Sequence, residues 1–358
     1  MTKILLISNM YPGNEKDQDR GVFVKNFISS IQEVDNSISF SKIVIKGRKY
    51  GIDQIIAYLI FYLKIIYRSI FCKYDLIYVH FITYSSLPLL FLLPFKRFKL
   101  ILNIHGSDFI VKSNVDRLIL NLIKPLIKHS SLIVVPSNIY KNQVSKKFNL
   151  LPDKIFVYAS GGINTSIFFP QNTNLNEEFV VGMVSRISPQ KGWDIFLEAM
   201  RQLKEESIIF RTIVVGGGAE ENDFVKLKEK YELKNIEFKG FKPQKELPYY
   251  FNQMSVMIFP TLRLQESLGL VGLEAMSCGV PVIGSRIGGL QDYLSERYNG
   301  FLFEPGNYKQ LAQKIKDFYH LDVEKKKEIQ KNAISTAKKY DSYHVTKQLI
   351  ASVNKITK

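Results

Sequence analysis

The sequence predicts an α/β protein with two doubly wound parallel sheets, and two features of the chain carry this prediction. Short β-branched runs alternate with helix-length amphipathic segments along the 358 residues, a pattern typical of βα units on parallel sheets. The alternation stops at a polar, Pro- and Asn-rich stretch, residues 168–178, and then starts again. We therefore expect two Rossmann-like domains joined by a linker.

Each half of the chain is expected to supply the strands of one sheet. The first half provides residues 3–9, 39–45, 75–81, 99–105, 131–136 and 154–158. The second half provides residues 179–186, 210–215, 235–238, 256–260, 281–285 and 300–303. The N-terminal run becomes polar after six residues, so we interpret it as a buried first strand and not as a signal peptide.

Composition bounds the class of protein. With 46% hydrophobic residues, the chain can bury two cores of ordinary domain size. Its two cysteines, Cys72 and Cys278, lie far apart in apolar settings, which argues against a disulfide framework or a metal site and fits a reducing cytoplasm. No uninterrupted apolar run reaches the roughly 18 residues that a membrane span needs; the longest candidate, residues 55–71, is broken by Lys64 and Arg68.

The net charge of +16 is unevenly distributed. Residues 1–165 contain 22 Lys and Arg against 10 Asp and Glu, whereas residues 166–358 contain 27 against 23. A basic first half suggests an anionic partner, such as nucleic acid, a phospholipid surface or a phosphorylated acceptor, although solubility alone explains such a charge equally well. No recognition motif supports a nucleic-acid-binding protein, which stays the alternative from a different class.

Two carboxylates mark the segment richest in chemistry. Glu266 and Glu274 lie eight positions apart, just after an expected strand. A helix beginning near Ser267 or Leu268 would separate them by about 12 Å, roughly the span from sugar to ribose in a nucleotide sugar. It would also aim free N–H groups and its positive dipole end at a phosphate. A lone pair of acids would more simply be two solvated side chains, so the neighbouring residues decide between these readings.

The residues between and after the two glutamates continue one sequence pattern. Gly269 and Gly272 would leave the backbone between the acids open to a ligand. The run continues through residues 274–285 (EAMSCGVPVIGS), 288–289 (GG) and 299–306 (NGFLFEPG). The whole block resembles the Glu-x7-Glu motif and its surroundings in retaining glycosyltransferases of family 4, which have the GT-B fold.

The resemblance implies two Rossmann-like domains that face a central cleft. Residues 1–167 would form an acceptor-binding domain and residues 168–340 a nucleotide-sugar-binding domain. A last helix, residues 341–358, would cross back to the first domain. Residues 161–168 resemble the family's segment at the domain junction, with Gly161 where Asn is common and Asn164 where Asp is common.

Arg186 and Lys191 follow the first strand of the second half, at the edge where open α/β sheets bind ligands. A forked guanidinium and a point-charge ammonium can together neutralise a diphosphate without a metal. They resemble the family's Gly-Arg-x4-Lys-Gly signature, with Ser185 in place of the first Gly. By that resemblance, both hold the leaving diphosphate.

Other donor contacts rest on glycine-rich turns. Gly216 and Gly217 end a strand, where the backbone can approach a phosphate or nucleoside. In the family, the segment at Phe241 lies against the nucleobase, and a Gly-Gly pair closes on the phosphate where this chain has Arg20 and Gly21. The predicted donor-binding residues are Gly21, Gly216, Gly217, Phe241, Ser267, Leu268, Gly269, Leu270, Val271 and Glu274.

His105 ends an expected strand and is predicted to be exposed at its tip, where the family places a His that contacts the donor sugar. Asp108 is expected either to bind the acceptor or to cap the next helix. The predicted catalytic residues are therefore His105, Glu266, Arg186 and Lys191. No metal site and no cofactor are expected beyond the nucleotide diphosphate sugar as co-substrate.

The implied reaction transfers a hexosyl unit with retention, a UDP sugar being favoured over a GDP sugar. The two Glu lie too far apart for the double-displacement mechanism of retaining glycosidases. Glu266 would hold a sugar hydroxyl and Glu274 the ribose hydroxyls, while the departing diphosphate takes the acceptor's proton. Other GT-B enzymes, such as a transferase to a soluble acceptor, a sugar-nucleotide epimerase or a phosphorylase, are the alternatives within the fold.

The acceptor is expected to bind to the first half of the chain. Residues 54–73 predict an aromatic-rich helix with a few basic residues, and residues 87–99 add a second apolar segment with a basic end. Such segments suit a membrane interface, although most of this apolar surface is expected to cover the first sheet. The preferred acceptor is a lipid-linked saccharide at the inner membrane surface, in the assembly of O-antigen, capsule or exopolysaccharide by a cytoplasmic, peripheral enzyme.

Overall fold

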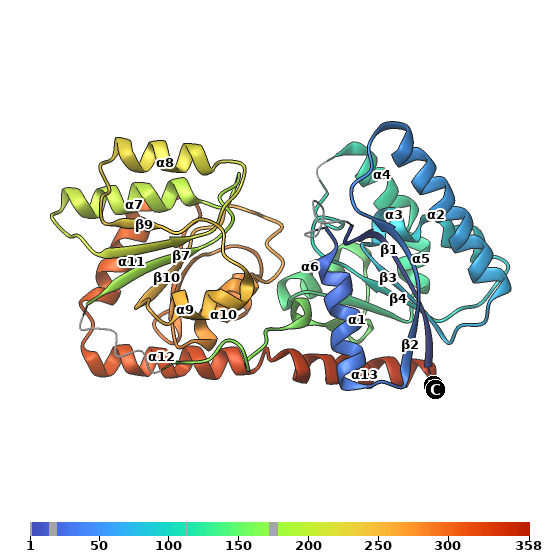
Figure 1. The fold of residues 1–358 in the computed structure, drawn as a ribbon. Helices are drawn as coiled ribbons and strands as arrows, with labels where there is room; N and C mark the ends of the chain where they lie inside the picture. Colours follow the sequence, from blue (N-terminus) through green and yellow to red (C-terminus); the bar gives the residue numbers. More distant parts are fainter. Residues whose placement is uncertain (1, 14–19, 112, 172–177) are drawn as a thin grey trace. The chain divides into compact units, whose positions relative to one another are not determined.

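The computed structural model describes residues 2–13, 20–111, 113–171 and 178–358, and the chain divides into two compact units (Figure 1). The first unit comprises Met1–Gly162 and Ser342–Lys358, and the second comprises Ile163–Asp341. The expected linker, residues 168–178, falls at the start of the second unit, and its residues 172–177 lie outside the described residues.

A six-stranded parallel sheet forms the centre of the first unit, in the order β2-β1-β3-β4-β5-β6. Its strands are β1 (Thr2–Tyr11), β2 (Ile38–Lys46), β3 (Leu76–His80), β4 (Leu100–Asn103), β5 (Leu132–Val135) and β6 (Ile155–Val157). Its helices are α1 (Val22–Val34), α2 (Gly51–Phe71), α3 (Ile82–Ser86), α4 (Asn114–Leu122), α5 (Lys124–His129), α6 (Asn138–Phe148) and α13 (Ser342–Thr357), with 3-10 turns η2 (Leu87–Leu92), η3 (Pro152–Lys154) and η4 (Ala159–Gly161).

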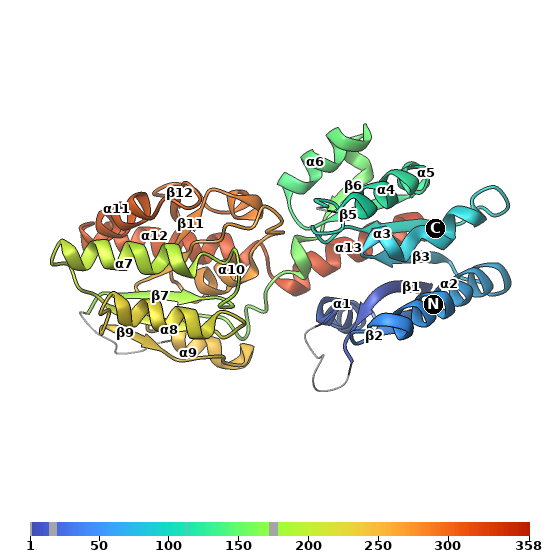
Figure 2. The same ribbon diagram turned by 90° about the horizontal axis from the view of Figure 1, so that it is seen from above.

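Alternating side chains of β1 reach the two faces of this sheet. Leu5 and Ile7 join a buried cluster with Phe61 and Ile65 of α2, whereas α1 and α13 pack together on the other face (Figures 1 and 2). The hydroxyl groups of Tyr158 and Thr346 lie 3.0 Å apart and tie α13 to the end of the sheet. The C-terminal helix is thus part of the first unit.

The second unit repeats the plan with a six-stranded parallel sheet, in the order β12-β11-β10-β7-β8-β9. Its strands are β7 (Val180–Val184), β8 (Arg211–Val215), β9 (Ile236–Phe238), β10 (Val256–Phe259), β11 (Val282–Ser285) and β12 (Gly300–Phe303). Its helices are α7 (Trp193–Glu205), α8 (Glu221–Lys230), α9 (Leu247–Phe251), α10 (Leu270–Ser277), α11 (Tyr308–Tyr319) and α12 (Val323–Lys338), with 3-10 turns η5 (Gln244–Glu246) and η6 (Gly288–Asp292).

Strand order locates the edge at which each sheet can bind a ligand. Open α/β sheets bind ligands beyond the carboxyl ends of their strands, where the direction of strand progression reverses. In the second sheet this reversal falls between the neighbours β7 and β10, and in the first sheet it falls between β1 and β3. The loops after these four strands are therefore where functional side chains should gather.

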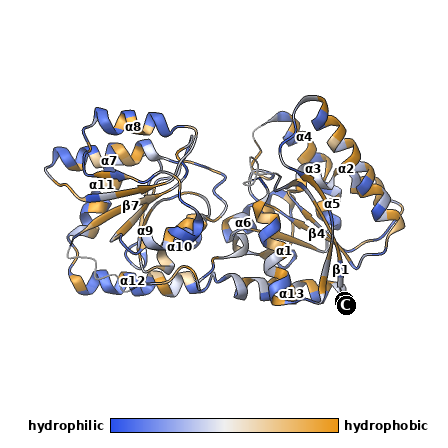
Figure 3. Ribbon diagram, in the orientation of Figure 1, coloured by the Kyte–Doolittle hydropathy of each residue, from blue (hydrophilic) through white to orange (hydrophobic). Residues whose placement is uncertain are grey.

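The predicted fold class is confirmed: each half forms a parallel sheet flanked by helices, and every expected strand is present. The strand ends differ from the expected ones by at most two residues: β1 and β2 are longer than expected, and most of the other strands are shorter. One expectation about packing is wrong. The apolar residues of α2 do not mainly cover the sheet, since only Phe61 and Ile65 among them are buried. Hydrophobic residues extend around α2, including its outer side (Figure 3).

The two units also differ in charge. The first unit carries 25 Lys and Arg against 10 Asp and Glu, so +15, whereas the second carries 24 against 23, so +1. Within the described residues one helix, α2, is long and apolar enough to cross a membrane by length and composition.

Candidate functional site

The loop after β7 is held against the end of β10 by a glycine. Gly192 has φ 74°, and a Cβ there would lie 1.8 Å from the carbonyl oxygen of Pro260, so no other residue fits without displacing the backbone. The loop ends at Gly192 because α7 begins at the next residue. This close approach places Lys191 beside the segment that carries Glu266.

Lys191 and Glu266 form a buried ion pair. The Lys191 Nζ atom donates to Glu266 Oε2 at 2.9 Å, and the two side chains are only 11% and 10% exposed. The Thr261 hydroxyl donates to the same oxygen at 3.2 Å. Burial lowers the pKa of Lys191, and the adjacent Glu266 carboxylate counteracts that shift. The structure therefore brings together two of the predicted catalytic residues.

Two further cations, Arg263 and Arg186, influence the Lys191–Glu266 ion pair electrostatically. The positive charges of Arg263 and Arg186 both lower the pKa of Lys191, which shows that they lie within electrostatic range of its ammonium. Arg186 is exposed in the loop after β7. Arg263 was missed by the sequence analysis, although its position three residues before Glu266 could have suggested it. Three cations and the Glu266 carboxylate leave an excess of positive charge at this sheet edge, which suits a diphosphate.

The helix after Glu266 begins later than expected. α10 starts at Leu270, not near Ser267 or Leu268, because Gly269 takes a left-handed conformation with φ 81° and serves as the N-cap. Glu266 thus lies on the preceding loop and Glu274 on the helix, so a helical rise does not set their separation. The N–H groups of Leu270 and Val271 have no intrahelical acceptor and remain available to an anion.

Gly269 and Gly272 make room for neighbouring protein atoms, and the predicted contact of Gly269 with the donor stays a prediction. A Cβ on Gly272 would lie 2.3 Å from the Tyr293 hydroxyl oxygen, and one on Gly269 would lie 2.8 Å from the Phe259 ring. The Tyr293 hydroxyl donates to the Gly269 carbonyl at 3.1 Å. These two glycines let α10 approach β10 and Tyr293, and so fix the direction of the helix.

Glu274 is buried in α10 and is 5% exposed. Gln244 Nε2 donates to its Oε1 at 2.6 Å. Burial raises the pKa of the Glu274 carboxyl to about 7, and the hydrogen bond from Gln244 partly offsets the shift. Gln244 lies 30 positions away in η5, and no sequence signal indicated it.

The loops after β8 and β9 meet the loop after β7 through main-chain contacts. The Gly216 N–H donates to the Gly240 carbonyl at 2.9 Å, and a Cβ on Gly216 would lie 1.8 Å from the Ser185 carbonyl oxygen. The Ile187 N–H donates to the Gly217 carbonyl at 3.0 Å. Phe241 is 76% exposed beside these glycines, so its ring is free to meet a base.

The first unit has its own cluster at the carboxyl end of the sheet. His105 is half-buried and not exposed as expected, because its ring packs against Phe23 and against His80 at the end of β3. His80 Nδ1 and His105 Nε2 lie 3.0 Å apart. The other ring nitrogen of His105, Nδ1, does not contact His80 in this pair. Burial lowers the pKa of His105 to about 3, so its ring is neutral near pH 7.

Asp108 organises the loop that carries His105. Its carboxylate accepts from the N–H groups of His105 and Gly106, each at 2.9 Å, and from that of Ile82 at 3.0 Å. It thereby caps α3 and not the next helix, α4, whose N-cap is Ser113. Burial raises the pKa of Asp108 to about 6, opposed by these hydrogen bonds. The residue is 1% exposed, and its hydrogen bonds hold the loop in place, while acceptor binding by Asp108 stays a prediction.

Gly21 is the N-cap of α1, with φ 74°. A Cβ there would lie 2.6 Å from the main chain at Met10 and Tyr11, so Gly21 lets α1 begin against the end of β1. Residues 14–19 of the preceding loop lie outside the described residues. Within the described part of the chain, no three His, Cys, Asp or Glu side chains form a group that could hold a metal ion.

Comparison with known protein families agrees with this geometry. The model described as Glycosyl transferases group 1 matches residues 165–336, and the model described as Glycosyltransferase Family 4 matches residues 30–166. The chain belongs to the family 4 glycosyltransferases. The two matches meet at the junction between the units, and the second unit contains the Lys191–Glu266 pair.

Relatives of this glycosyltransferase include proteins of Methanocaldococcus jannaschii and Escherichia coli. It is 28% identical over 72% of its length to an uncharacterised glycosyltransferase of Methanocaldococcus jannaschii, of which the match covers 67%. It is 26% identical over 64% of its length to the putative colanic acid biosynthesis glycosyltransferase WcaL of Escherichia coli, of which the match covers 57%. The alignment thus spans a little over half of the second relative.

Solved structures show the same GT-B fold. HepE of Anabaena in complex with UDP is similar with a TM-score of 0.75 and 19% identity, over 99% of this chain and 100% of that one. A glycosyltransferase of Rickettsia africae is similar with a TM-score of 0.78 and 18% identity, over 100% and 99% of the two chains.

Proposed function

We propose that this glycosyltransferase moves a hexosyl unit from a UDP sugar to a lipid-linked or other saccharide acceptor, with retention at the anomeric carbon. The observation that carries the proposal is the buried Lys191–Glu266 pair, with Arg186 and Arg263 close by, at the β7/β10 reversal of the second sheet. A site with three cations and one carboxylate suits a ligand that joins a diphosphate to a sugar.

In this proposal, the diphosphate lies beside Arg186 and Lys191, near the free N–H groups at the start of α10. Glu266 accepts a hydrogen bond from a sugar hydroxyl, and Glu274 accepts from the ribose. The bond from C1 to the diphosphate oxygen breaks while the acceptor oxygen bonds C1 on the same face. The acceptor proton passes to the departing diphosphate oxygen. The cations stabilise the charge that develops on this leaving group.

His105 is proposed to contact the donor sugar through Nδ1, as a neutral imidazole. His80 would orient this ring through its contact with Nε2. Asp108 has the positioning role that its hydrogen bonds support.

The donor and pathway are supported by similar proteins. The Anabaena HepE structures contain UDP or UDP-glucose. Relatives named for polysaccharide assembly include CapM of Staphylococcus aureus, at 30% identity over 39% of this chain, and AmsK of Erwinia amylovora, at 27% over 38%. We propose a role in bacterial surface polysaccharide synthesis, on the cytoplasmic side of the membrane and in contact with its anionic surface.

Binding of the donor tests this function. UDP-glucose, UDP-galactose, UDP-N-acetylglucosamine and GDP-mannose should be compared by thermal shift, because a bound donor raises the melting temperature by mass action. We expect a UDP sugar to give the largest shift. Incubation of that donor with lipid-linked saccharide should then release UDP and give a product with the anomeric configuration of the donor. Inversion, measured by NMR coupling, or no shift with any UDP sugar would contradict the proposal.

A further inference from the structure

Helix α2 turns a wide apolar face away from the protein. Residues at helical spacing along this face have 44–71% of their surface exposed. They are Ile52, Ile55, Ile56, Leu59, Ile60, Leu63, Tyr67, Ile70 and Phe71. Exposed apolar residues that follow one another along a helix face form a continuous patch, and such patches mark interaction surfaces.

The opposite face of α2 is packed into the core of the first unit. Phe61 is 3% exposed and Ile65 is fully buried, and both join the core cluster under the first sheet. Although α2 is long enough to span a membrane, this buried face fixes it to the sheet. The helix can therefore lie on an apolar layer but cannot cross one without unfolding the unit.

The patch continues past the end of α2. Lys96 Nζ donates to the carbonyl oxygens of Ser69 and Ile70 at 2.6 and 3.2 Å, which fastens the segment after η2 to the last turn of α2. Phe91 of η2 and Phe95 of the following segment are 72% and 87% exposed. Two large aromatic side chains thus extend the apolar surface.

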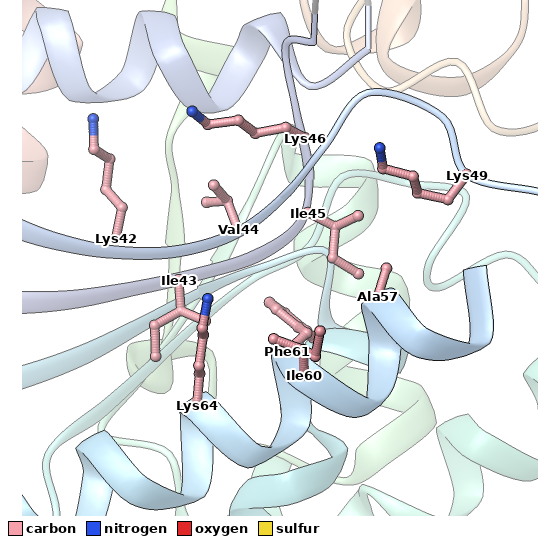
Figure 4. Close-up of a pocket in the computed structure, with 10 residues that line it drawn as sticks. All are labelled: Lys42, Ile43, Val44, Ile45, Lys46, Lys49, Ala57, Ile60, Phe61 and Lys64. Atoms are coloured by element: carbon pink, nitrogen blue, oxygen red, sulfur yellow. The ribbon is translucent and has the colours of Figure 1, made fainter. Parts of the chain in front are cut away.

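A lysine-lined cavity lies beside this patch, between the edge strand β2 and α2. It has a volume of about 410 Å³ and is lined by four lysines and six apolar residues. Lys42 and Lys46 come from β2, Lys49 from the loop that follows, and Lys64 from α2. Figure 4 shows Lys42 and Lys46 on the side of β2 away from α2, with Val44 between them, whereas Ile43 and Ile45 point toward Ala57, Ile60 and Phe61 of α2. Ile60 lines the cavity and belongs to the exposed patch, so the two features share a border.

The cavity's charge is poorly compensated. Lys42 Nζ lies 5.6 Å from the centroid of the Tyr11 ring, a cation–π contact, but no carboxylate among the described residues bonds to the ammonium groups that line the cavity. Lys64 follows Leu63 on the helix, so its charge flanks the apolar face. A molecule that joins an anionic group to apolar chains could place the anion beside the cavity lysines and the chains against the exposed face of α2.

We propose that the cavity of Lys42, Lys46, Lys49 and Lys64 binds the phosphate of an anionic membrane lipid, while the exposed face of α2 enters the bilayer interface. Lysines that flank an apolar helix face are typical of helices lying in the plane of a membrane surface. This inference rests on the membrane contact in the proposed function, and it names the surface responsible. A second copy of the chain would cover the apolar face but would bring its own lysines toward these lysines.

Vesicle flotation with the full chain tests the site. The wild type, Lys46→Glu/Lys49→Glu/Lys64→Glu and Leu59→Gln/Leu63→Gln should be compared on phosphatidylcholine vesicles with and without phosphatidylglycerol. We expect the wild type to bind the anionic vesicles at least about tenfold more strongly than the neutral ones, and each variant to lose at least about tenfold of that affinity. The charge-matched control is Lys226→Glu/Lys230→Glu/Lys234→Glu, which reverses three exposed lysines of the second unit and should bind as the wild type does.

Three outcomes would overturn this proposal. One is wild-type binding by the Lys46/Lys49/Lys64 variant; another is binding of inorganic phosphate by the wild type without binding to anionic vesicles. The third is a concentration-dependent dimer in analytical ultracentrifugation that Leu59→Gln/Leu63→Gln abolishes, with no vesicle binding. The thermal shift with UDP-glucose is measured on every variant. Its absence in the wild type would contradict the proposed donor and leave the membrane result standing.

Discussion

The two units share a layout of strands and helices but use charge in opposite ways. The second unit is almost neutral, and its acids and bases meet in ion pairs such as Arg211–Glu237 and Lys314–Glu296. The first unit carries +15, and several of its lysines line one cavity next to an exposed apolar helix. In the proposed function this difference separates two tasks: donor chemistry in the second unit and attachment to an acceptor-bearing surface through the first.

The candidate site of the second unit is not charge-balanced, unlike the rest of that unit. Its cations outnumber the nearby acid, since Lys191, Arg186 and Arg263 accompany Glu266. An excess of positive charge at the β7/β10 edge is what a diphosphate would neutralise. The site residues can therefore be separated from the surrounding structural ion pairs by mutation.

The largest effect is expected from Lys191→Ala. Removing the ammonium leaves the Glu266 carboxylate buried without its cation, which destabilises a protein by about 3–5 kcal/mol for a typical buried pair. We expect a lower melting temperature, and at least a tenfold fall in kcat/KM because a charge-assisted bond contributes about 1.5–3 kcal/mol. Lys191→Ala/Glu266→Gln should recover much of the stability but not the activity. Recovery of both would assign the pair a purely structural role.

Arg186→Ala should affect activity without affecting stability. Arg186 is exposed, so its loss removes no packing and leaves the melting temperature unchanged. We expect kcat/KM to fall about tenfold or more, as for the loss of one charge-assisted bond to the diphosphate. Lys226→Ala, at another exposed cation of the second unit, is the matched control. Equal activity in both variants would remove Arg186 from the donor site.

A smaller effect is expected from the pH dependence of Glu274. Its pKa is raised to about 7 by burial, so the carboxylate that we propose to accept ribose hydroxyls forms only as the pH rises through 7. Affinity for UDP-glucose, measured by calorimetry between pH 5.5 and 8.5, should therefore increase by a few-fold. Glu274→Gln should bind more weakly, with no such rise. UDP-glucose is the right probe because its diphosphate, unlike a terminal phosphate, has no ionisation near pH 6.

The same carboxyl predicts a trend in stability. A folded-state pKa raised above the unfolded value near 4.5 means that the folded state keeps its proton longer. The free energy of unfolding should then fall as pH rises from about 4.5 to 7 and level off above it. Chemical denaturation of Glu274→Gln should show a flatter profile in this window. An identical profile in both proteins would mean that Glu274 titrates normally.

The sequence predicted the backbone of this fold better than its side-chain partners. Hydrophobic periodicity placed every strand, and the residue types around Arg186, Lys191 and Glu266 led to the prediction of a phosphate and sugar site. The start of α10 was missed because it depends on the left-handed conformation of Gly269, which a helical pattern does not reveal. Gln244 and Arg263 were missed because only folding brings them to the site.

The exposure of the outer face of α2 was underestimated for a different reason. An apolar helix sequence is compatible with burial on both sides, and only the positions of neighbouring elements show that one face stays exposed. The contacts of the two lysines after η2 also depend on folding. Lys96 Nζ donates to main-chain carbonyls of α2, and Lys99 Nζ donates to the Thr357 carbonyl. These two lysines support the fold, whereas the cavity lysines are the better probes of membrane charge.

The separation of tasks between the units is tested most directly by calorimetric titration of UDP-glucose. The wild type, Arg186→Ala and Lys46→Glu/Lys49→Glu/Lys64→Glu should be titrated under one buffer condition. We predict that Kd rises about tenfold or more in Arg186→Ala and stays at the wild-type value in the lysine variant. An unchanged Kd in Arg186→Ala, together with a weakened Kd in the lysine variant, would place donor binding in the first unit and contradict this account.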